Sequence, residues 1–338
     1  MKLQISQIAK KAGVTSMVVS RVLQGMPTVK KADRDRVEKV IGRMRMDTVS
    51  PFPAKRKTQK VFGLIVTRFE DIFHSFYATE VIKGVFLAAS RLKIDVMVHI
   101  SERQKHEDWL TSASLSPENI DGILFADINS DLMQLKKVLA RKIPCIVLNN
   151  YFEKEPINSI AIDNEKAAVD VCEFLVGLGH TRIATIAGDL STEAGRKRLE
   201  GFKSCMKSHN LRLSPRYITT GHFLRSPARK GMESLLKLSE PPTAVFAASD
   251  VMAMEAIDVA RRLGLHVPGD VSIIGFDDNP LCAYSPVPLS TVWQPIAEMG
   301  RMGVEFLNQI ISGKKKQPVK MLLDTKLIER KSCGRLEH

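Results

Sequence analysis

Several features that identify other classes of protein are missing from this 338-residue sequence. Its five cysteines, at positions 145, 172, 205, 282 and 333, form no CxxC pair, and no cysteine or histidine cluster has the spacing of metal ligands. We expect these cysteines to be reduced, structural thiols. No run of about 18 apolar residues predicts a transmembrane helix, and the first residues lack the apolar core of a signal peptide. The sequence favours a cytoplasmic protein without a membrane partner.

Enzyme signatures are missing as well. The sequence contains no GxGxxG after a strand, no GxxxxGK(S/T), no HExxH and no GxSxG, and its eight histidines share no spacing. Nucleotide cofactor loops, zinc-protease helices and serine-hydrolase turns are therefore not indicated. We expect a protein that is not an enzyme and that needs no cofactor and no metal.

Acidic residues are scarce at one end of the chain. The formal net charge is +13, and residues 1–60 hold 15 Lys or Arg against 4 Asp or Glu, so +11 of it lies there. Such a segment attracts a polyphosphate, because binding releases condensed counterions. The basic residues coincide with helical patterning rather than with low complexity. This coincidence favours nucleic acid as the partner over the alternative of a solvated basic tail.

Two short helices joined by a tight turn are predicted within residues 5–24. Ser6 is a candidate cap for the first helix, Gly13 tolerates the positive φ of the turn, and Thr15 is a candidate cap for the second. The spacing i, i+3, i+4 predicts one buried face made of Val19, Val22 and Leu23. The opposite face then carries Ser16, Met17, Ser20 and Arg21. A helix with one aliphatic side and one polar, basic side is typical of a helix-turn-helix.

The rest of the N-terminal region divides into a helix and a linker. A third amphipathic helix fits residues 31–44 and would close a small core over the first two. Residues 47–60 contain two prolines, no apolar period and several basic residues, a composition that predicts a linker.

From residue 61 onward, strand and helix patterns alternate. Short aliphatic runs occur at 61–66, 94–100, 122–126, 145–150, 159–163, 182–188, 243–249 and 271–278. The amphipathic stretches between them include 76–91, 164–178, 193–209, 226–237, 251–263 and 296–312. Continuous apolar strands separated by helices predict parallel sheets covered on both faces. The strands are too many for one ordinary sheet, so we expect two α/β lobes with a ligand between them, at the carboxyl ends of strands.

The residues by themselves leave the chemistry of this cleft open. Arg196 and Arg198 begin a helix after a strand, where an arginine can bind an oxygen-rich ligand or can simply face solvent. Asp277 and Asp278 end an aliphatic run, where a carboxylate can accept sugar hydroxyls or can cap the next helix.

Several motifs, in the same order along nearly the whole chain, resemble the lactose/galactose repressor family of bacterial transcription factors. They are IAKKAGVTSMVVSRVLQG near the N-terminus and then LGHTRIATIAG, RKRLEGF, PTAVFAASDVMAMEAI, LGLHVPGDVSIIGFDD and PLSTVWQP. The resemblance implies an all-α helix-turn-helix headpiece, followed by a two-lobed α/β effector domain with parallel sheets. This domain would be similar to type I periplasmic binding proteins.

The resemblance also implies how the chain is divided and assembled. The headpiece would comprise 1–46 and the hinge 47–60. The N-terminal lobe would comprise 61–162 plus 293–323, and the C-terminal lobe 163–292 plus 324–335. Residues 336–338 look like the scar of a purification tag. The family binds a palindromic operator in double-stranded DNA as a homodimer.

Contacts to DNA carry over by position in the headpiece motif. Arg21 falls where an arginine reaches a base edge, preferably of guanine. Ser16 and Met17 fall where the family varies to select sequence, and Thr15 would touch phosphate. Supporting contacts match Ser6, Ser20, Gln24 and Thr28.

The hinge departs from the family pattern. Related repressors wedge a leucine into the minor groove here, but Ala54 or Lys55 occupies that place in this sequence. Phe52 is the only large apolar side chain available as a wedge. Three interpretations stay open: Phe52 is the wedge, with Lys55 beside it at the DNA; the protein bends DNA less than its relatives; or the segment is a disordered tether.

The effector site carries over as eight residues: Ser75, Phe76, Tyr77, Asn149, Arg198, Phe223, Ser249 and Asp277. Arg198 matches the arginine that grips the ligand, and Phe223 matches an aromatic that stacks on it. Asn149 and Ser249 depart from an aspartate and an asparagine that are common in the family. The implied small-molecule effector is therefore a sugar, a sugar acid or a nucleoside.

These features predict a sequence-specific transcriptional regulator, expected to be a repressor, whose affinity for DNA is linked to effector binding. A solute-binding protein for sugar uptake is the alternative that the two-lobed body alone would permit, but the basic headpiece argues against it. A sugar- or nucleotide-processing enzyme would need an acid/base pair or a cofactor loop, and neither is evident.

Overall fold

The computed structural model describes residues 5–23, 26, 29–43, 59–68, 75–102, 115–126 and 132–336. The chain forms two compact units, Met1–Arg56 and Lys57–His338, called here the headpiece and the body. Among the residues that the structure describes, no helix combines the length and the apolar character that crossing a bilayer requires.

The headpiece is built from three helices: α1 (Ile5–Ala12), α2 (Ser16–Leu23) and α3 (Lys31–Arg43). Gly13 adopts a φ of 67° in the turn between α1 and α2, a value that suits a residue without a Cβ. The small core consists of Ile8, Ala9, Ala12, Val19 and Val37, all buried. The predicted helix pair and the buried position of Val19 are therefore observed.

Two details of the headpiece differ from the sequence prediction. Ser6 lies inside α1 and is exposed, so it does not cap this helix, which begins one residue earlier, at Ile5. Leu23 is 44% exposed rather than buried. It is the last residue of α2, beyond the part of the helix that α1 and α3 cover.

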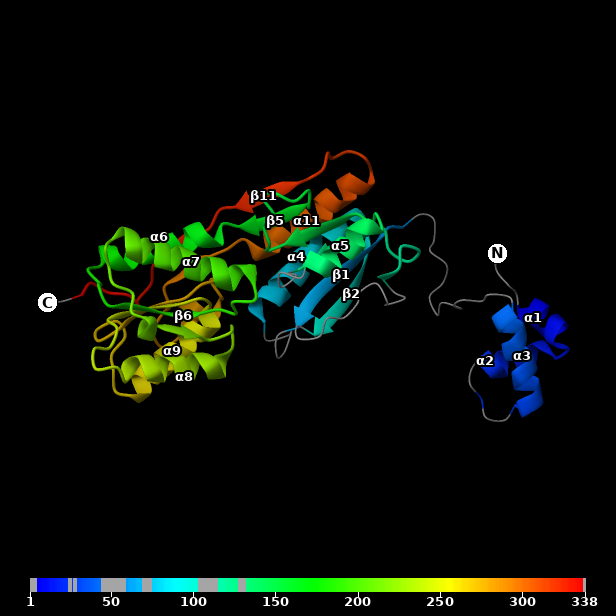
Figure 1. The fold of residues 1–338 in the computed structure, drawn as a ribbon, viewed down its shortest axis with the longest axis horizontal. Helices are drawn as coiled ribbons and strands as arrows, with labels where there is room; N and C mark the ends of the chain where they lie inside the picture. The colour runs from blue at the N-terminus through cyan, green and yellow to red at the C-terminus, as the bar shows by residue number, and fades with distance from the viewer. Residues whose placement is uncertain are drawn as a thin grey trace. The chain divides into compact units, whose positions relative to one another are not determined.

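The body contains two parallel sheets (Figure 1). The larger one has the strand order β11-β5-β4-β3-β1-β2. Its strands are β1 (Val61–Arg68), β2 (Asp95–Glu102), β3 (Gly122–Phe125), β4 (Cys145–Leu148), β5 (Ser159–Ile162) and β11 (Lys320–Leu323). The smaller one has the order β7-β6-β8-β9. Its strands are β6 (Ile183–Ala187), β7 (Ile218–Thr220), β8 (Ala244–Ala247) and β9 (Ser272–Ile274).

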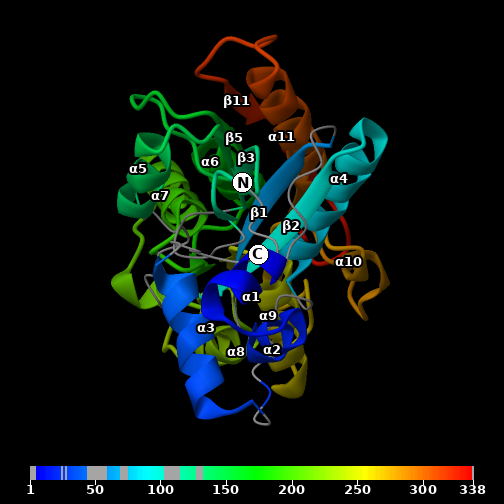
Figure 2. The same cartoon turned by 90° about the vertical axis from the view of Figure 1, so that its right-hand side faces the viewer.

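Helices cover both faces of each sheet. On the larger sheet, α4 (Phe76–Leu92) and α11 (Ile296–Ile311) pack side by side on one face, and α5 (Leu132–Ala140) packs on the other (Figures 1 and 2). On the smaller sheet, α6 (Asn164–Gly177) and α7 (Glu193–Ser208) oppose α8 (Arg225–Leu236) and α9 (Asp250–Arg262). Strand β1 illustrates the two-sided burial, because Leu64 and Ile65 enter different cores.

The chain passes between the sheets three times. It leaves the larger sheet after β5, returns through β10 (Thr291–Trp293) into α11, and leaves again from β11 into β12 (Lys326–Ile328). Strands β10 and β12 form a small antiparallel pair. The remaining elements are a 3₁₀ turn at Pro215–Tyr217 and the short helix α10 (Leu281–Tyr284). The residue boundaries expected for the headpiece, hinge and lobes stay predictions.

The cysteines correct one expectation. Cys172 of α6 and Cys205 of α7 form a disulfide, whereas Cys145, Cys282 and Cys333 are free and buried. The two residues are 33 positions apart in sequence, yet their Cα atoms are 6.2 Å apart because α6 and α7 pack against each other. Such a pairing leaves no spacing motif, so the sequence did not reveal it.

The contact between α6 and α7 depends on a glycine. A Cβ at Gly201 of α7 would lie 2.1 Å from the backbone oxygen of Glu165 in α6. We expect Gly201→Ala to lower the free energy of unfolding by about 1–3 kcal/mol, because the helices must separate to admit a methyl group. The control is Gly177→Ala at the end of α6, where a Cβ meets nothing within 4 Å. This control should be neutral or slightly stabilising. Urea unfolding followed by circular dichroism measures both, and equal loss in the two variants would contradict the packing argument.

Candidate functional site

The outward face of α2 carries the residues predicted to read DNA. Thr15 precedes the helix, and its Oγ1 accepts a hydrogen bond from the Val18 amide at 3.4 Å, as a cap does. Val19 is fully buried below, whereas Ser16, Arg21 and Met17 are exposed, Met17 by 63%. Ser20 is half-buried on the same side. The helix therefore presents a basic and adaptable surface of the kind that enters a major groove.

The other predicted DNA contacts have different outcomes. Ser6 is exposed on α1. Gln24, Thr28, Phe52 and Lys55 lie outside the described residues, so the interpretation of the hinge stays a prediction.

All eight predicted effector residues line one cavity of the body, with a volume of about 800 Å³. They are Ser75, Phe76, Tyr77, Asn149, Arg198, Phe223, Ser249 and Asp277. Three of them lie just beyond the carboxyl end of a strand: Asn149 after β4, Ser249 after β8, and Asp277 after β9. The carboxyl ends of parallel strands form the usual binding crevice of α/β folds. Residues from both sheets therefore meet in a single site.

Local backbone geometry brings these side chains into the cavity. Ser75 caps α4 and Ser249 caps α9, each accepting a hydrogen bond from an amide three residues ahead. Asn149, Phe223 and Asp277 have positive φ values of 67°, 61° and 129°. Strained backbone of this kind is common at ligand sites.

Arg198 forms the centre of the site. It is 3% exposed, its Nε donates to Oδ1 of Asn164 at 2.8 Å, and its Nη1 donates to the Ala248 carbonyl at 2.7 Å. The guanidinium carbon lies 3.5 Å from the centroid of the Phe276 ring. Burial lowers the pKa of Arg198 to about 10, although Asp277 opposes this shift. Within the described part of the chain, these two hydrogen bonds orient the guanidinium through its Nε and Nη1.

Asp277 is the acidic partner of this arginine. Its Oδ1 lies 3.8 Å from Nη1 of Arg198 and accepts a hydrogen bond from Nε2 of Gln294 at 2.6 Å. Burial raises the pKa of Asp277 to about 7, against the attraction of Arg198, and the neighbouring Asp250 adds to the rise. A carboxyl group of this kind can exchange a proton or accept hydroxyl hydrogens near neutral pH.

Two buried amide oxygens at the cavity lack hydrogen-bond partners within the described residues. They are Oδ1 of Asn149 and Oε1 of Gln294, both on residues that line the cavity. The amide nitrogen of Gln294 donates to Asp277, which holds the amide oxygen at the cavity when Asp277 is ionised. An unpaired buried acceptor costs free energy, so a ligand that offers O–H or N–H donors would be favoured here.

Sequence reasoning missed several residues of the cavity. Gln294 lies in the motif PLSTVWQP, directly after β10, so its position at a strand end was the available signal. Asn164 supports Arg198 from the start of α6. A group of charged residues at one end of the cavity, called here its outer end, also went unnoticed, because no sequence pattern connects them. They are Arg225, Arg229, Glu255, Asp258 and Arg262.

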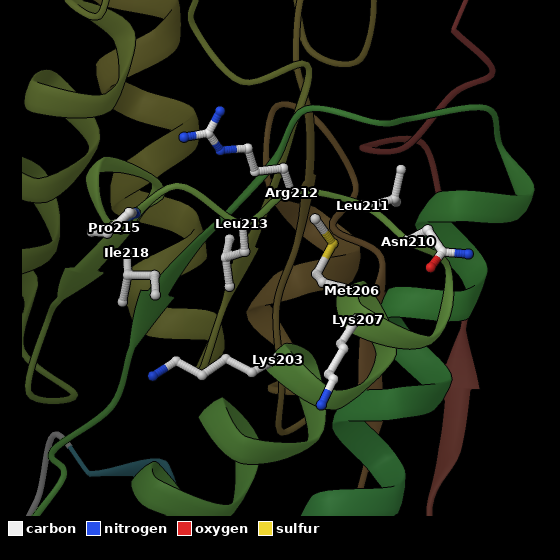
Figure 3. A pocket seen from close by; sticks show the side chains of 9 residues that line it. All are labelled: Lys203, Met206, Lys207, Asn210, Leu211, Arg212, Leu213, Pro215 and Ile218. Carbon is white, nitrogen blue, oxygen red and sulfur yellow. The ribbon is translucent and has the colours of Figure 1, made fainter.

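A second hollow, of about 670 Å³, lies near the end of α7. Its basic residues are Lys203, Lys207 and Arg212, and their charged ends point in different directions (Figure 3). None of the predicted site residues lines it. Without converging polar groups, this hollow has no binding geometry comparable to that of the first cavity.

One group of potential metal ligands occurs among the described residues: Glu173, Cys205 and His209. His209 is already paired with Glu173 at 2.8 Å, and the sulfur of Cys205 is bonded to Cys172. A disulfide sulfur is not the thiolate that metals require, so the group carries no metal in this state.

Comparison with known proteins agrees with this arrangement. Residues 4–45 match the family model of bacterial regulatory proteins of the lacI family, and residues 172–333 match that of a periplasmic binding protein-like domain. The chain is 34% identical to the HTH-type transcriptional repressor CytR of Escherichia coli K12, over 98% of this chain and 96% of CytR. It is 30% identical to catabolite control protein A of Priestia megaterium, over 92% and 93% of the two chains. The chain belongs to the lacI family.

Solved structures agree with the predicted fold class of this lacI-family protein. A complex of the transcriptional regulator CelR with cellobiose has a TM-score of 0.74 at 27% identity, covering 98% of this chain and all of CelR. A lac repressor dimer bound to operator and an anti-inducer has a TM-score of 0.74 over 99% of this chain, and at 24% identity it shows the fold alone. The predictions of a helix-turn-helix headpiece, a two-lobed periplasmic-binding-protein-like body and a DNA-binding transcriptional regulator are confirmed. The relatives are regulators rather than enzymes.

The raised pKa of Asp277 gives the lacI-family body a defined pH dependence. Between the ordinary value of 3.8 and about 7, the folded state holds a proton that the unfolded state releases. This proton stabilises the folded state fully below pH 3.8, and its contribution is lost as the pH rises toward about 7. The free energy of unfolding falls by at most about 1.4 kcal/mol per pH unit over this range. We expect Asp277→Asn to remove it, so that the variant gains stability relative to wild type from pH 4 to pH 7. Urea unfolding across this range measures the stability of both proteins. If the stabilities of wild type and Asp277→Asn changed with pH in parallel, burial would not be what controls the pKa of Asp277.

Proposed function

We propose that this regulator represses transcription in the cytoplasm by binding a palindromic operator in double-stranded DNA as a homodimer. A small hydroxylated effector, namely a sugar, a sugar acid or a nucleoside, binds in the cavity and changes the affinity for DNA. The observation that carries the effector assignment is the convergence of eight side chains on one cavity, where two buried amide oxygens have no hydrogen-bond partner among the described residues.

The character of the cavity suits a polyhydroxylated ligand. Arg198 supplies a buried donor, and Asp277, Asn149 and Gln294 supply acceptors. Phe223 supplies an aromatic face, of the kind on which a ring can stack. The solved relative CelR is described as a complex with cellobiose, which supports a carbohydrate-like class.

We infer binding without catalysis from the state of the acids. Asp277 is held by Gln294 and faces Arg198. Burial would raise the pKa of Glu255, but hydrogen bonds from Arg229 and Arg225 outweigh it and hold that pKa below its ordinary value. Glu255 is therefore a counter-ion and not a proton donor, so Asp277 and Glu255 do not form an acid/base pair for hydrolysis.

A surface for the second copy lies on the larger sheet and its helix. Phe86 and Leu87 of α4 and Val98 and Ile100 of β2 are large apolar residues that are exposed. Strand β2 is an edge strand, where exposed apolar side chains favour association. A two-fold copy of the same chain would cover this surface.

Effector binding can influence the affinity for DNA through the three passages of the chain between the sheets. A change in the angle between the lobes must bend these passages, which flank β10 and β12. Lys60, where the hinge enters the body, donates to Asn308 of α11 at 2.6 Å and to Ser312 at 2.9 Å. The start of the body is thereby tied to α11, which packs on the larger sheet and follows the second passage. By linkage, DNA changes effector affinity by the same factor.

The DNA-binding role of α2 is tested by Arg21→Ala. We expect it to weaken operator binding by about 1–3 kcal/mol and to relax specificity at one base pair, because a base-edge contact is lost. The control is Arg141→Ala, an exposed arginine of the body. Fluorescence anisotropy at several salt concentrations provides the measurement. Unchanged affinity of the Arg21 variant would contradict the assignment, as would equal affinity for one half-site and for the full palindrome.

The effector role of the cavity is tested by Arg198→Lys. Thermal shift with a panel of sugars, sugar acids and nucleosides should identify a ligand that stabilises the wild type. We expect its affinity to fall at least about ten-fold in the variant, because an ammonium cannot replace the planar guanidinium. Arg196→Ala is the control, since Arg196 lies on the same helix but faces Glu200 at the surface. Equal shifts in wild type and Arg198→Lys would exclude this arginine from the site.

A further inference from the structure

The cavity extends well beyond the eight predicted residues. One face of α9 forms its outer wall, through Val251, Met254, Glu255, Asp258 and Arg262. These positions follow the spacing i, i+3, i+4, i+7 and i+11, which keeps them on one side of a helix. At about 1.5 Å per residue this wall is about 16 Å long, more than a single sugar ring can span.

A cluster of paired charges lies at the outer end. Glu255 is only 3% exposed, and its carboxylate accepts hydrogen bonds from Nε of Arg225 at 2.5 Å and from Nη2 of Arg229 at 2.7 Å. Nη2 of Arg262 pairs with Asp258 at 2.9 Å. Three guanidinium groups therefore share two carboxylates among the residues that line this end.

The arginines keep donors that the acids do not use. A guanidinium has five N–H donors, and Arg225 gives only its Nε to Glu255, within the described residues. The side chain of Arg225 is 76% exposed, so the rest of its donors face open space. Two arginines on one carboxylate exceed what neutralising Glu255 requires. Arg229 already holds Glu255 through two donors, Nε at 3.1 Å and Nη2 at 2.7 Å, so Arg225 is not needed to neutralise this carboxylate.

We propose that the outer end is a second subsite, which binds an oxyanion on the far unit of an elongated effector. The ligand then has a hydroxylated ring at Arg198 and Asp277 and a carboxylate or phosphate at Arg225 and Arg262. This inference rests on the proposed effector function and narrows it to acidic ligands of at least two linked units. Glu255 holds Arg225 and Arg229 in place, as a positioning residue for the donors.

The test compares matched neutral and anionic ligands by isothermal titration calorimetry. The pairs are cellobiose and cellobionate, lactose and lactobionate, trehalose and trehalose 6-phosphate, and uridine and uridine monophosphate. We expect the anionic member of the recognised pair to bind at least about ten-fold more tightly than its neutral partner, with an advantage that shrinks as salt is added. If the preference for the anionic ligand occurs in the carboxylate pairs, the oxyanion is a carboxylate. If it occurs in the phosphate pairs, the oxyanion is a phosphate.

Two variants locate the effect. Arg262→Gln and Arg225→Gln should each weaken binding of the anionic ligand more than binding of its neutral partner, and so reduce the preference for the anionic ligand. In Arg225→Gln, Glu255 still accepts hydrogen bonds from Arg229. Circular dichroism checks that both variants are folded. The control is Arg261→Gln, the neighbouring exposed arginine of α9, which does not line the cavity.

The outcomes separate this inference from the function on which it rests. Neutral ligands that bind as tightly as anionic ones, with a dependence on Arg198 but not on Arg262 or Arg225, would overturn the second subsite and leave the effector function intact. An anionic preference that survives in both outer variants would also overturn it. No binding of any pair member would contradict the effector class and the second subsite together.

Discussion

The buried guanidinium of Arg198 is the constraint on which the body depends. A charge without water is costly unless it is hydrogen-bonded and paired. Here the compensation comes from Asn164 at the start of α6, the Ala248 carbonyl after β8, and Asp277 after β9. One side chain thus fixes the ends of several elements at the same point. It is also the point where the chain first passes from the larger sheet to the smaller one.

This arrangement explains why binding and lobe geometry are coupled. The partner of Arg198 at Asp277 is held in turn by Gln294, which directly follows β10 on the second passage between the sheets. A ligand that engages Arg198, Asp277 and Gln294 contacts the second passage directly, and it reaches the first passage through the hydrogen bond between Arg198 and Asn164. Because a ligand shifts an equilibrium only by its differential affinity for the two states, contacts of this kind are where that difference can arise.

The two ends of the cavity have different electrostatic characters. At the inner end the charges are buried, and the pKa of Asp277 is raised to about 7. At the outer end the arginines are partly exposed, and burial of Glu255 is offset by two of them. Screening by salt therefore affects the outer end more than the inner end. For a ligand that spans both ends, the inner end would select for shape and the outer end would select for charge.

Local patterns in the sequence were enough to predict the helices and strands and their order. Periodicity located most of them, and Gly13 and Thr15 marked the turn and cap of the headpiece. These features depend on residues a few positions apart, whereas eight of the residues that line the cavity were identified by their positions in motifs along the chain. The disulfide between Cys172 and Cys205, the link between Gln294 and Asp277, and the cluster at Glu255 became evident only in the folded chain. Each of these joins residues that are far apart in sequence, and only the packing of helices and strands brings such residues within bonding distance.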